Sequence, residues 1–219
     1  MGLIDDVGAW AWVADAAASY EQKSALFLDR DGVIVHETDF LSRPEHVVLV
    51  PGAGDTIAAF NRANVPVIVV TNQSGIARGH FSWAEFETVE TEIAKQLAEA
   101  AGAHLDAVFA CGYHGSGTGS LARGDHPWRK PNPGMLWAAT ELLGVRLETS
   151  WIVGDRARDL ATGRAAGLAG GVHVGTGYGG AKERRASLAL ANSDFQVEPS
   201  ADITGALQLC NRMAEQADH

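Results

Sequence analysis

The feature that most restricts the fold of this 219-residue chain is the apolar run Val65-Pro66-Val67-Ile68-Val69-Val70. Most of its residues are β-branched and none is polar, which is typical of a strand buried on both faces. A proline near the start of such a strand is tolerated. We therefore expect residues 65–70 to form a central strand of a parallel sheet.

Shorter apolar runs alternate with helical patterns along the rest of the chain. We expect further strands at 25–28, 106–110, 151–153 and 171–174, and helices at 52–62, 82–101, 133–144, 157–167 and 202–216. The longest helix has the clearest start, because Ser82 and Glu85 form a capping-box pattern. This alternation predicts an α/β fold, a Rossmann-like parallel sheet with helices on both faces.

The chain is expected to divide into an extension and one domain. Residues 1–24 are Ala-rich, and we expect a short N-terminal helical extension that docks Trp10 and Trp12 on the main body; an interaction surface is the alternative. Residues 25–219 are expected to form a single domain. Within it, residues 111–128 form a long loop rich in glycine, serine and histidine, and loops of that length are often functional.

Composition and charge exclude several classes of partner. The chain has 17 Lys and Arg against 27 Asp and Glu, a net charge of −10, which disfavours nucleic acid and anionic membranes. An anionic substrate would therefore need a local basic pocket. Two distant cysteines, Cys111 and Cys210, make no disulfide scaffold. No apolar run approaches the roughly 18 residues of a membrane span, and Asp5 and Asp6 stand where a signal peptide would be basic. We expect a cytoplasmic protein.

The strongest chemical signal follows the first strand of the domain. An apolar strand leads directly into Asp29-Arg30-Asp31-Gly32. Residues two apart on a strand face the same side, so Asp29 and Asp31 should project together. Two close carboxylates repel unless a cation lies between them or one is protonated. The pattern therefore predicts a Mg²⁺ site of oxygen ligands, or a nucleophile beside a proton donor.

Polar residues also follow the other strands, and ligands in such sheets bind beyond the carboxyl ends of the strands. The relevant segments are Thr71-Asn72-Gln73-Ser74-Gly75, Arg129-Lys130-Pro131-Asn132-Pro133 and Gly154-Asp155-Arg156-Ala157-Arg158-Asp159. They offer carboxylates for a cation, a hydroxyl and amides for an oxyanion, and basic groups for phosphate. Each segment alone could be a turn, a cap or a solvated surface. Their joint occurrence at strand ends predicts a phosphate-processing site.

This combination resembles the haloacid dehalogenase superfamily of phosphohydrolases over residues 25–178. The resemblance implies a nucleophile, a general acid/base, a phosphate-binding hydroxyl, a lysine and a metal-binding carboxylate at Asp29, Asp31, Thr71, Lys130 and Asp155, respectively. It implies that Asp159 orients Lys130 or a metal-bound water. It also implies the fold of that superfamily, without a large cap domain, because core helices fill most of the gaps between the motifs.

The implied reaction is Mg²⁺-dependent hydrolysis of a phosphomonoester through an aspartyl-phosphate. Mg²⁺ would be held by Asp29, by the carbonyl of Asp31 and by Asp155. The phosphoryl oxygens would be bound by Thr71, the amide of Asn72 and Lys130. A second anionic group of the substrate would meet Arg129, with Ser74 and Arg78 at an entrance shaped by residues 35–44 and 111–128.

Longer stretches narrow the resemblance. The segments Phe27–Gly32, Val70–Gly79 and Arg129–Met135 are similar to those of the D-glycero-D-manno-heptose 1,7-bisphosphate phosphatases, which share a subfamily with histidinol-phosphate phosphatases. The run from Gln73 to Gly79 favours the heptose substrate, whereas residues 154–159 are nearer the histidinol-phosphate pattern. Heptose bisphosphate is thus the favoured substrate, and histidinol phosphate or another small phosphorylated metabolite is the alternative. A non-catalytic phosphosugar-binding protein is less favoured.

The long loop departs from that subfamily. Its members usually hold a structural zinc with Cys-x-His and a later Cys-x-Cys. Here Cys111 fills the first position, but Tyr113, His126 and Trp128 stand at the other three. A substitute set would be Cys111, His114, Asp125 and His126. We expect instead that zinc is absent and that packing and hydrogen bonds hold the loop.

A glycine-rich pattern later in the chain suggests a different function, dinucleotide binding. The segment Gly175-Thr176-Gly177-Tyr178-Gly179-Gly180 fits G-x-G-x-x-G and follows a strand. The dinucleotide fingerprint belongs, however, at the first strand–helix turn of a fold, and Asp29 and Asp31 already occupy that turn. We expect a glycine loop near the phosphate site rather than a dinucleotide site.

Overall fold

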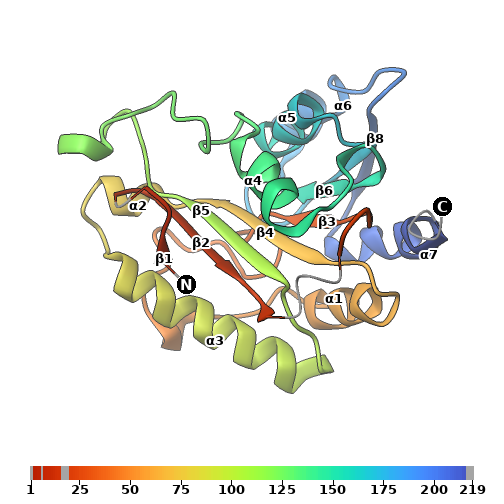
Figure 1. Ribbon diagram of the computed structural model, residues 1–219, viewed down its shortest axis with the longest axis horizontal. Helices are drawn as coiled ribbons and strands as arrows, with labels where there is room; N and C mark the ends of the chain where they lie inside the picture. The colour runs from red at the N-terminus through yellow and green to blue at the C-terminus, as the bar shows by residue number, and fades with distance from the viewer. Residues whose placement is uncertain (1, 6, 16–19, 216–219) are drawn as a thin grey trace.

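The computed structural model describes residues 2–5, 7–15 and 20–215 (Figure 1). In this part of the chain one sheet has the strand order β1-β2-β5-β4-β3-β6-β7-β8. The strands are β1 (Gly2–Leu3), β2 (Ala9–Val13), β3 (Leu26–Leu28), β4 (Val67–Asn72), β5 (Ala107–Cys111), β6 (Trp151–Gly154), β7 (Gly170–Val174) and β8 (Gln196–Ser200). The helices are α1 (Ala53–Arg62), α2 (Ser74–Ala77), α3 (Trp83–Ala101), α4 (Gly134–Leu143), α5 (Ala157–Ala166), α6 (Ala181–Leu188) and α7 (Cys210–Glu215).

The six strands from β3 to β8 pair in parallel, and two hydrophobic cores lie on opposite faces of the sheet. On β4, Val67 and Val69 belong to one core, whereas Ile68 and Val70 belong to the other. Helices α1 and α3 cover the first face, and α4 and α5 cover the second (Figure 1). The predicted α/β fold with a two-sided central strand is confirmed.

The prediction of a helical N-terminal extension is wrong for the residues described. Residues 2–3 and 9–13 form strands, and β2 pairs antiparallel with β5, which places Ala9 opposite Cys111. The segment Ala-Trp-Ala-Trp-Val alternates with a period of two, so Trp10 enters one core while Ala11 enters the other. Trp10 does dock on the main body, since it is 1% exposed and packs on Trp83 and Phe86. Residues 16–19 lie outside the described part.

The C-terminal third differs from the prediction in three elements. Strand β8 and helix α6 were not expected, and the single helix predicted over 202–216 is a 3₁₀ helix (Ile203–Leu209) followed by α7. β8 reads Gln-Val-Glu-Pro-Ser and lies at a sheet edge, so it carries no apolar run to signal it. The five strands predicted within the domain are all present.

The carboxyl ends of β3, β4 and β6 meet at one edge of the sheet. Asp29 follows β3 directly, and its amide donates to Val153 O of β6 at 2.9 Å. The segment after it turns tightly, with bridges from Asp31 to Val35 and from Val35 to Leu49, and inserts no cap domain. Among the described helices, none has both the length and the apolar character needed to span a membrane.

Candidate active site

Three buried carboxylates converge at this edge of the sheet. Single oxygens of Asp29, Asp155 and Asp159 all lie within 4.8 Å of one another. One buried cation faces them: Lys130 Nζ lies 2.9 Å from Asp29 Oδ1 and 2.7 Å from Asp159 Oδ1. The ammonium also donates to Val70 O at 2.9 Å, so its position is fixed by three oxygens. The cluster has more buried negative charge than this one ammonium can neutralise.

The raised pKa values of Asp155 and Asp29 reflect burial and the same excess of negative charge. Burial, followed by Asp29 and Asp159, raises the pKa of Asp155 to about 8. Burial also raises the pKa of Asp29, although Lys130 acts in the opposite direction. Crowded carboxylates of this kind ionise together readily only when a cation lies among them.

The donor set fits a hard divalent cation such as Mg²⁺, which prefers a few carboxylate oxygens. Asp155 is oriented by the backbone of the glycine loop, because Tyr178 N donates to its Oδ2 at 2.7 Å. The same loop lies so close that a Cβ on Gly177 would be 2.4 Å from that oxygen. The glycine-rich pattern therefore packs against Asp155, the predicted metal ligand.

Asp159 is committed to protein partners. Its Oδ1 pairs with Lys130, and its Oδ2 accepts from Arg156 N at 3.0 Å at the start of α5. Of the two roles implied for Asp159, its position favours the orientation of Lys130. Asn72 also positions this lysine, because its side chain bonds the backbone N and O of Lys130 at 3.1 and 3.2 Å.

Asp31 and Thr71 are joined to each other through Gln73. The Gln73 amide group donates to Asp31 Oδ2 at 3.0 Å and to Thr71 Oγ1 at 2.9 Å. Asp31 lines the cavity beside Asp29, whereas Thr71 is fully buried behind Asn72 and Gln73, which do line it. The structure thus brings the predicted residues into one neighbourhood, with the Thr71 hydroxyl set back from the cavity wall.

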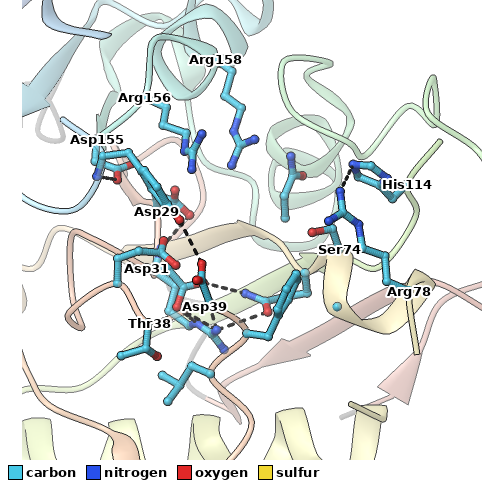
Figure 2. A pocket seen from close by; sticks show the side chains of 18 of the residues that line it. Asp29, Asp31, Thr38, Asp39, Ser74, Arg78, His114, Asp155, Arg156 and Arg158 are labelled. Atoms are coloured by element: carbon cyan, nitrogen blue, oxygen red, sulfur yellow. Dashed lines mark hydrogen bonds and ion pairs between the residues drawn. The ribbon is translucent and has the colours of Figure 1, made fainter. Parts of the chain in front are cut away.

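The cavity above the cluster has a volume of about 450 Å³, within the usual range for small-molecule sites. Five arginines line it: Arg30, whose guanidinium is paired with Asp31 and Glu90, and Arg78, Arg129, Arg156 and Arg158. Figure 2 shows Arg156 and Arg158 reaching toward Asp29 from one side, while Arg78 and His114 lie on the other. These arginines supply basic groups for an anionic substrate, although carboxylates line the same cavity at Asp29, Asp31, Glu37, Asp39 and Asp155.

Known proteins share this architecture. Residues 127–203 match the HAD-hydrolase-like family model. The D-glycero-beta-D-manno-heptose-1,7-bisphosphate 7-phosphatase of Mesorhizobium japonicum is 52% identical over 147 residues, 67% of either chain. A solved structure of a HAD-like protein from Mesorhizobium loti is 40% identical and covers 99% of this chain and 98% of its own, with a TM-score of 0.85. The D,D-heptose 1,7-bisphosphate phosphatase of B. bronchiseptica, solved with magnesium and phosphate, is 30% identical and covers 86% of this chain and 98% of its own, with a TM-score of 0.71.

The chain belongs to the haloacid dehalogenase-like phosphatases. The predicted resemblance to this family, with the heptose bisphosphate phosphatases among its similar members, is confirmed, and so is the prediction of a phosphatase.

In this phosphatase the four residues considered as a substitute zinc set, Cys111, His114, Asp125 and His126, do not form a group close enough to share a metal. Among the described residues, the only three or more His, Cys, Asp or Glu side chains close enough to share a metal are Asp29, Asp155 and Asp159. The Tyr113 ring stacks on His126 with centroids 4.0 Å apart, and its hydroxyl donates to Asp5 Oδ2 at 2.6 Å. Strand pairing by the N-terminal segment thus brings Asp5 to the base of the loop.

Several cavity residues of this phosphatase were not predicted from the sequence. They are Arg30, Glu37, Thr38, Asp39, His114, Arg156, Arg158 and Tyr178. Arg156 and Arg158 lie within the quoted 154–159 motif, and Tyr178 within the glycine pattern, so attention to the motif neighbours would have found them. Glu37 and Asp39 come from the 35–44 segment expected at the entrance, but no spacing signals them. The 111–128 loop contributes His114 to the lining.

Proposed function

We propose that this phosphatase transfers a phosphoryl group to Asp29 and then to water, with Mg²⁺ bound by Asp29, Asp155 and the carbonyl of Asp31. The observation that carries this proposal is the hydrogen bonding of the two Asp29 carboxylate oxygens. Its Oδ1 accepts from Lys130 Nζ and from Arg30 N, at 2.9 and 2.8 Å. No described group donates to Oδ2, and Asp29 lines the cavity, which leaves Oδ2 for attack on phosphorus.

When bound, Mg²⁺ would screen the repulsion between the Asp29 carboxylate and a phosphate dianion. Asp29 attacks phosphorus in line, and the bond to the leaving alkoxide breaks. Asp31 gives a proton to that alkoxide and later takes one from the water that hydrolyses the aspartyl-phosphate. The Asn72 amide and the charge of Lys130 stabilise the phosphoryl oxygens, where charge accumulates, and Thr71, set back from the cavity wall, supports this lining through Gln73.

The favoured substrate is D-glycero-D-manno-heptose 1,7-bisphosphate. The proposal rests on the similar heptose enzymes and on the four cavity arginines other than Arg30, which suit a second phosphate. Arg129 is the favoured partner of that phosphate, with Ser74 and Arg78 at the entrance. Histidinol phosphate, which carries a basic imidazole and ammonium, would place positive charge among these cations.

We further propose that the protein acts in the cytoplasm on a soluble metabolite, without nucleic acid or membrane as a partner. A net charge of −10 and two buried cysteines that form no disulfide support this setting.

Phosphate release from heptose 1,7-bisphosphate and from histidinol phosphate, side by side with Mg²⁺, tests the proposal. We expect faster release from the bisphosphate, loss of both activities in EDTA, and recovery on addition of Mg²⁺. Preference for histidinol phosphate would overturn the substrate assignment. Tight binding of the sugar phosphate without turnover would identify a non-catalytic binding protein.

A further inference from the structure

A buried chain of charges leads from helix α3 to the cavity. Glu90 Oε1 accepts from Arg30 Nη1 at 2.9 Å. The other side of the same guanidinium grips Asp31: Nε and Nη2 donate to Oδ1 at 3.0 and 2.8 Å, and Nη2 also lies 3.0 Å from Oδ2. Arg30 is 1% exposed and Glu90 is 8% exposed, so water contributes little to holding either group.

Glu90 is a charged residue at a buried position of α3 where apolar packing would be expected. The other buried positions of α3 are Phe86, Val89, Ile93 and Leu97, all apolar. Replacing a buried ion pair by apolar groups is often neutral or stabilising, so a stability role alone explains this carboxylate poorly. The guanidinium also lies 5.4 Å from the centroid of the Phe86 ring, which fixes its plane.

The network has the geometry of a clamp on Asp31. The planar fork of Arg30 restricts the rotation of the Asp31 carboxylate, and Gln73 holds its second oxygen. Gln73 Oε1 in turn accepts from Arg30 Nη2 at 3.2 Å. Glu90 binds Nη1, the one guanidinium nitrogen that contacts neither Asp31 nor Gln73. Glu90 therefore helps to set the orientation of the Arg30 guanidinium.

We propose that Glu90, acting through Arg30, is a positioning residue for proton donation by Asp31. This inference rests on the proposed function, in which Asp31 protonates the leaving group. Without the Glu90 anchor the guanidinium is free to turn about its remaining contacts, and the Asp31 carboxylate loses the fixed orientation that Arg30 gives it. A small error in placing a catalytic group is costly for the rate.

The dependence on the leaving group separates this role from a structural one. An alkoxide needs a proton as it departs, whereas p-nitrophenolate departs without one. The ratio kcat/KM reports the steps up to the departure of the leaving group, so it isolates this half of the reaction. We expect Glu90→Leu to lower kcat/KM for glycerol 2-phosphate by about 10²-fold, and for p-nitrophenyl phosphate by about threefold or less.

Glu90→Gln keeps an oxygen acceptor for Arg30 Nη1 and should recover part of the loss. It also serves where the leucine variant does not fold, as judged by its thermal unfolding. Glu87→Gln is the matched control, because Glu87 lies one turn earlier on α3 and bonds Trp10 Nε1 rather than the site. The control should leave the ratio of the two substrates unchanged.

Asp31→Asn, measured in the same assay, keeps the two hypotheses distinguishable. Selective loss on the alkyl ester in both the Asp31 and the Glu90 variants supports the positioning role. Selective loss in Asp31→Asn with equal losses on both esters in the Glu90 variants would overturn the positioning role and leave the proposed function standing. Absence of selectivity in Asp31→Asn itself would overturn the assignment of Asp31 as proton donor, and the positioning role of Glu90 with it.

Discussion

The cavity has two parts with different charge pairing: a buried floor of Asp29, Lys130, Asp155 and Asp159, and a rim of Arg78, Arg129, Arg156 and Arg158. On the floor, Asp29, Lys130, Asp155 and Asp159 are each at most 5% exposed; Lys130 pairs with Asp29 and Asp159, and Asp155 lies beside these carboxylates. On the rim, the arginines mostly contact groups without formal charge. Arg129 donates to a carbonyl, that of Tyr113, at 2.8 Å, and Arg156 lies 3.6 Å from the centroid of the Tyr178 ring.

From this difference we infer that the floor residues carry out the reaction and the rim arginines select the substrate. Floor residues whose charges are fixed by one another are already placed for a reaction, which lowers the reorganisation needed at the transition state. Rim arginines without carboxylate partners keep their charge for an incoming anion. The predictions below test this division, beginning with the largest effect.

Asp29→Asn should show the largest effect, because it removes the nucleophile. We expect kcat to fall by about 10⁴-fold or more, while the circular dichroism spectrum and the fold are unchanged. The control is Asp55→Asn on the exposed side of α1, which should retain full activity. Substantial turnover by the Asp29 variant would end the assignment of the floor as the reacting centre.

Lys130→Met should affect both activity and stability. The change leaves two buried carboxylates without their cation, so we expect a loss of about 3–5 kcal/mol in the free energy of unfolding. Activity should fall by about 10²–10³-fold, because a group that stabilises the phosphoryl oxygens is gone. The matched control is Lys95→Met, whose side chain is 58% exposed. Equal denaturant midpoints for the two variants would show that the floor is not a coupled charge cluster.

Arg129→Ala should affect the substrate choice more than the reaction itself. Loss of a charge-assisted hydrogen bond of about 1.5–3 kcal/mol predicts a fall of roughly 10–100-fold in kcat/KM for a sugar bisphosphate. The corresponding monophosphate should lose much less. Arg164→Ala, on the exposed surface of α5, is the control. Equal losses on both substrates would place Arg129 with the floor rather than with the rim.

Asp155→Asn should have the smallest effect, on the stability of the metal-free protein. The pKa of Asp155 is raised from 3.8 to about 8 in the folded state. Stability from this group is therefore present in acid and is lost as the pH rises from about 4 to about 8. In EDTA at pH 9 we expect the variant to exceed the wild type by about 1 kcal/mol, or roughly 2–4 °C in Tm.

This advantage should shrink toward pH 5, and Mg²⁺ should raise the Tm of the wild type but not that of the variant. A variant that is less stable than the wild type at pH 9 in EDTA would contradict the excess of negative charge on the floor.

The floor was predictable from the sequence, whereas the rim was predictable only in part. Asp29 and Asp155 each follow a short apolar strand, and parallel strands carry such residues to one edge of the sheet. The directions of Arg156 and Arg158 depend on how α5 packs, which no local pattern encodes. The placement of Asp159 against Lys130 was one of two alternatives, and only the tertiary structure favours one.

The N-terminal segment shows how strand pairing between distant residues can override a local helix preference. Its alanine content favours a helix, and a two-residue alternation over five residues is a weak signal. Strand pairing with β5 covers what would otherwise be a sheet edge and buries Trp10, and these gains exceed the local preference. Asp5 reaches the loop at Tyr113 only because of this pairing.

The central claim is that the Asp29 side chain carries the phosphoryl group during turnover. Rapid acid quenching of the working enzyme, borohydride reduction and peptide mass spectrometry test it directly, because an acyl phosphate is reduced to the alcohol. We predict homoserine at position 29 only when substrate and Mg²⁺ are both present. Unmodified aspartate at position 29 under conditions of full turnover, or reduction at another carboxylate, would contradict the account.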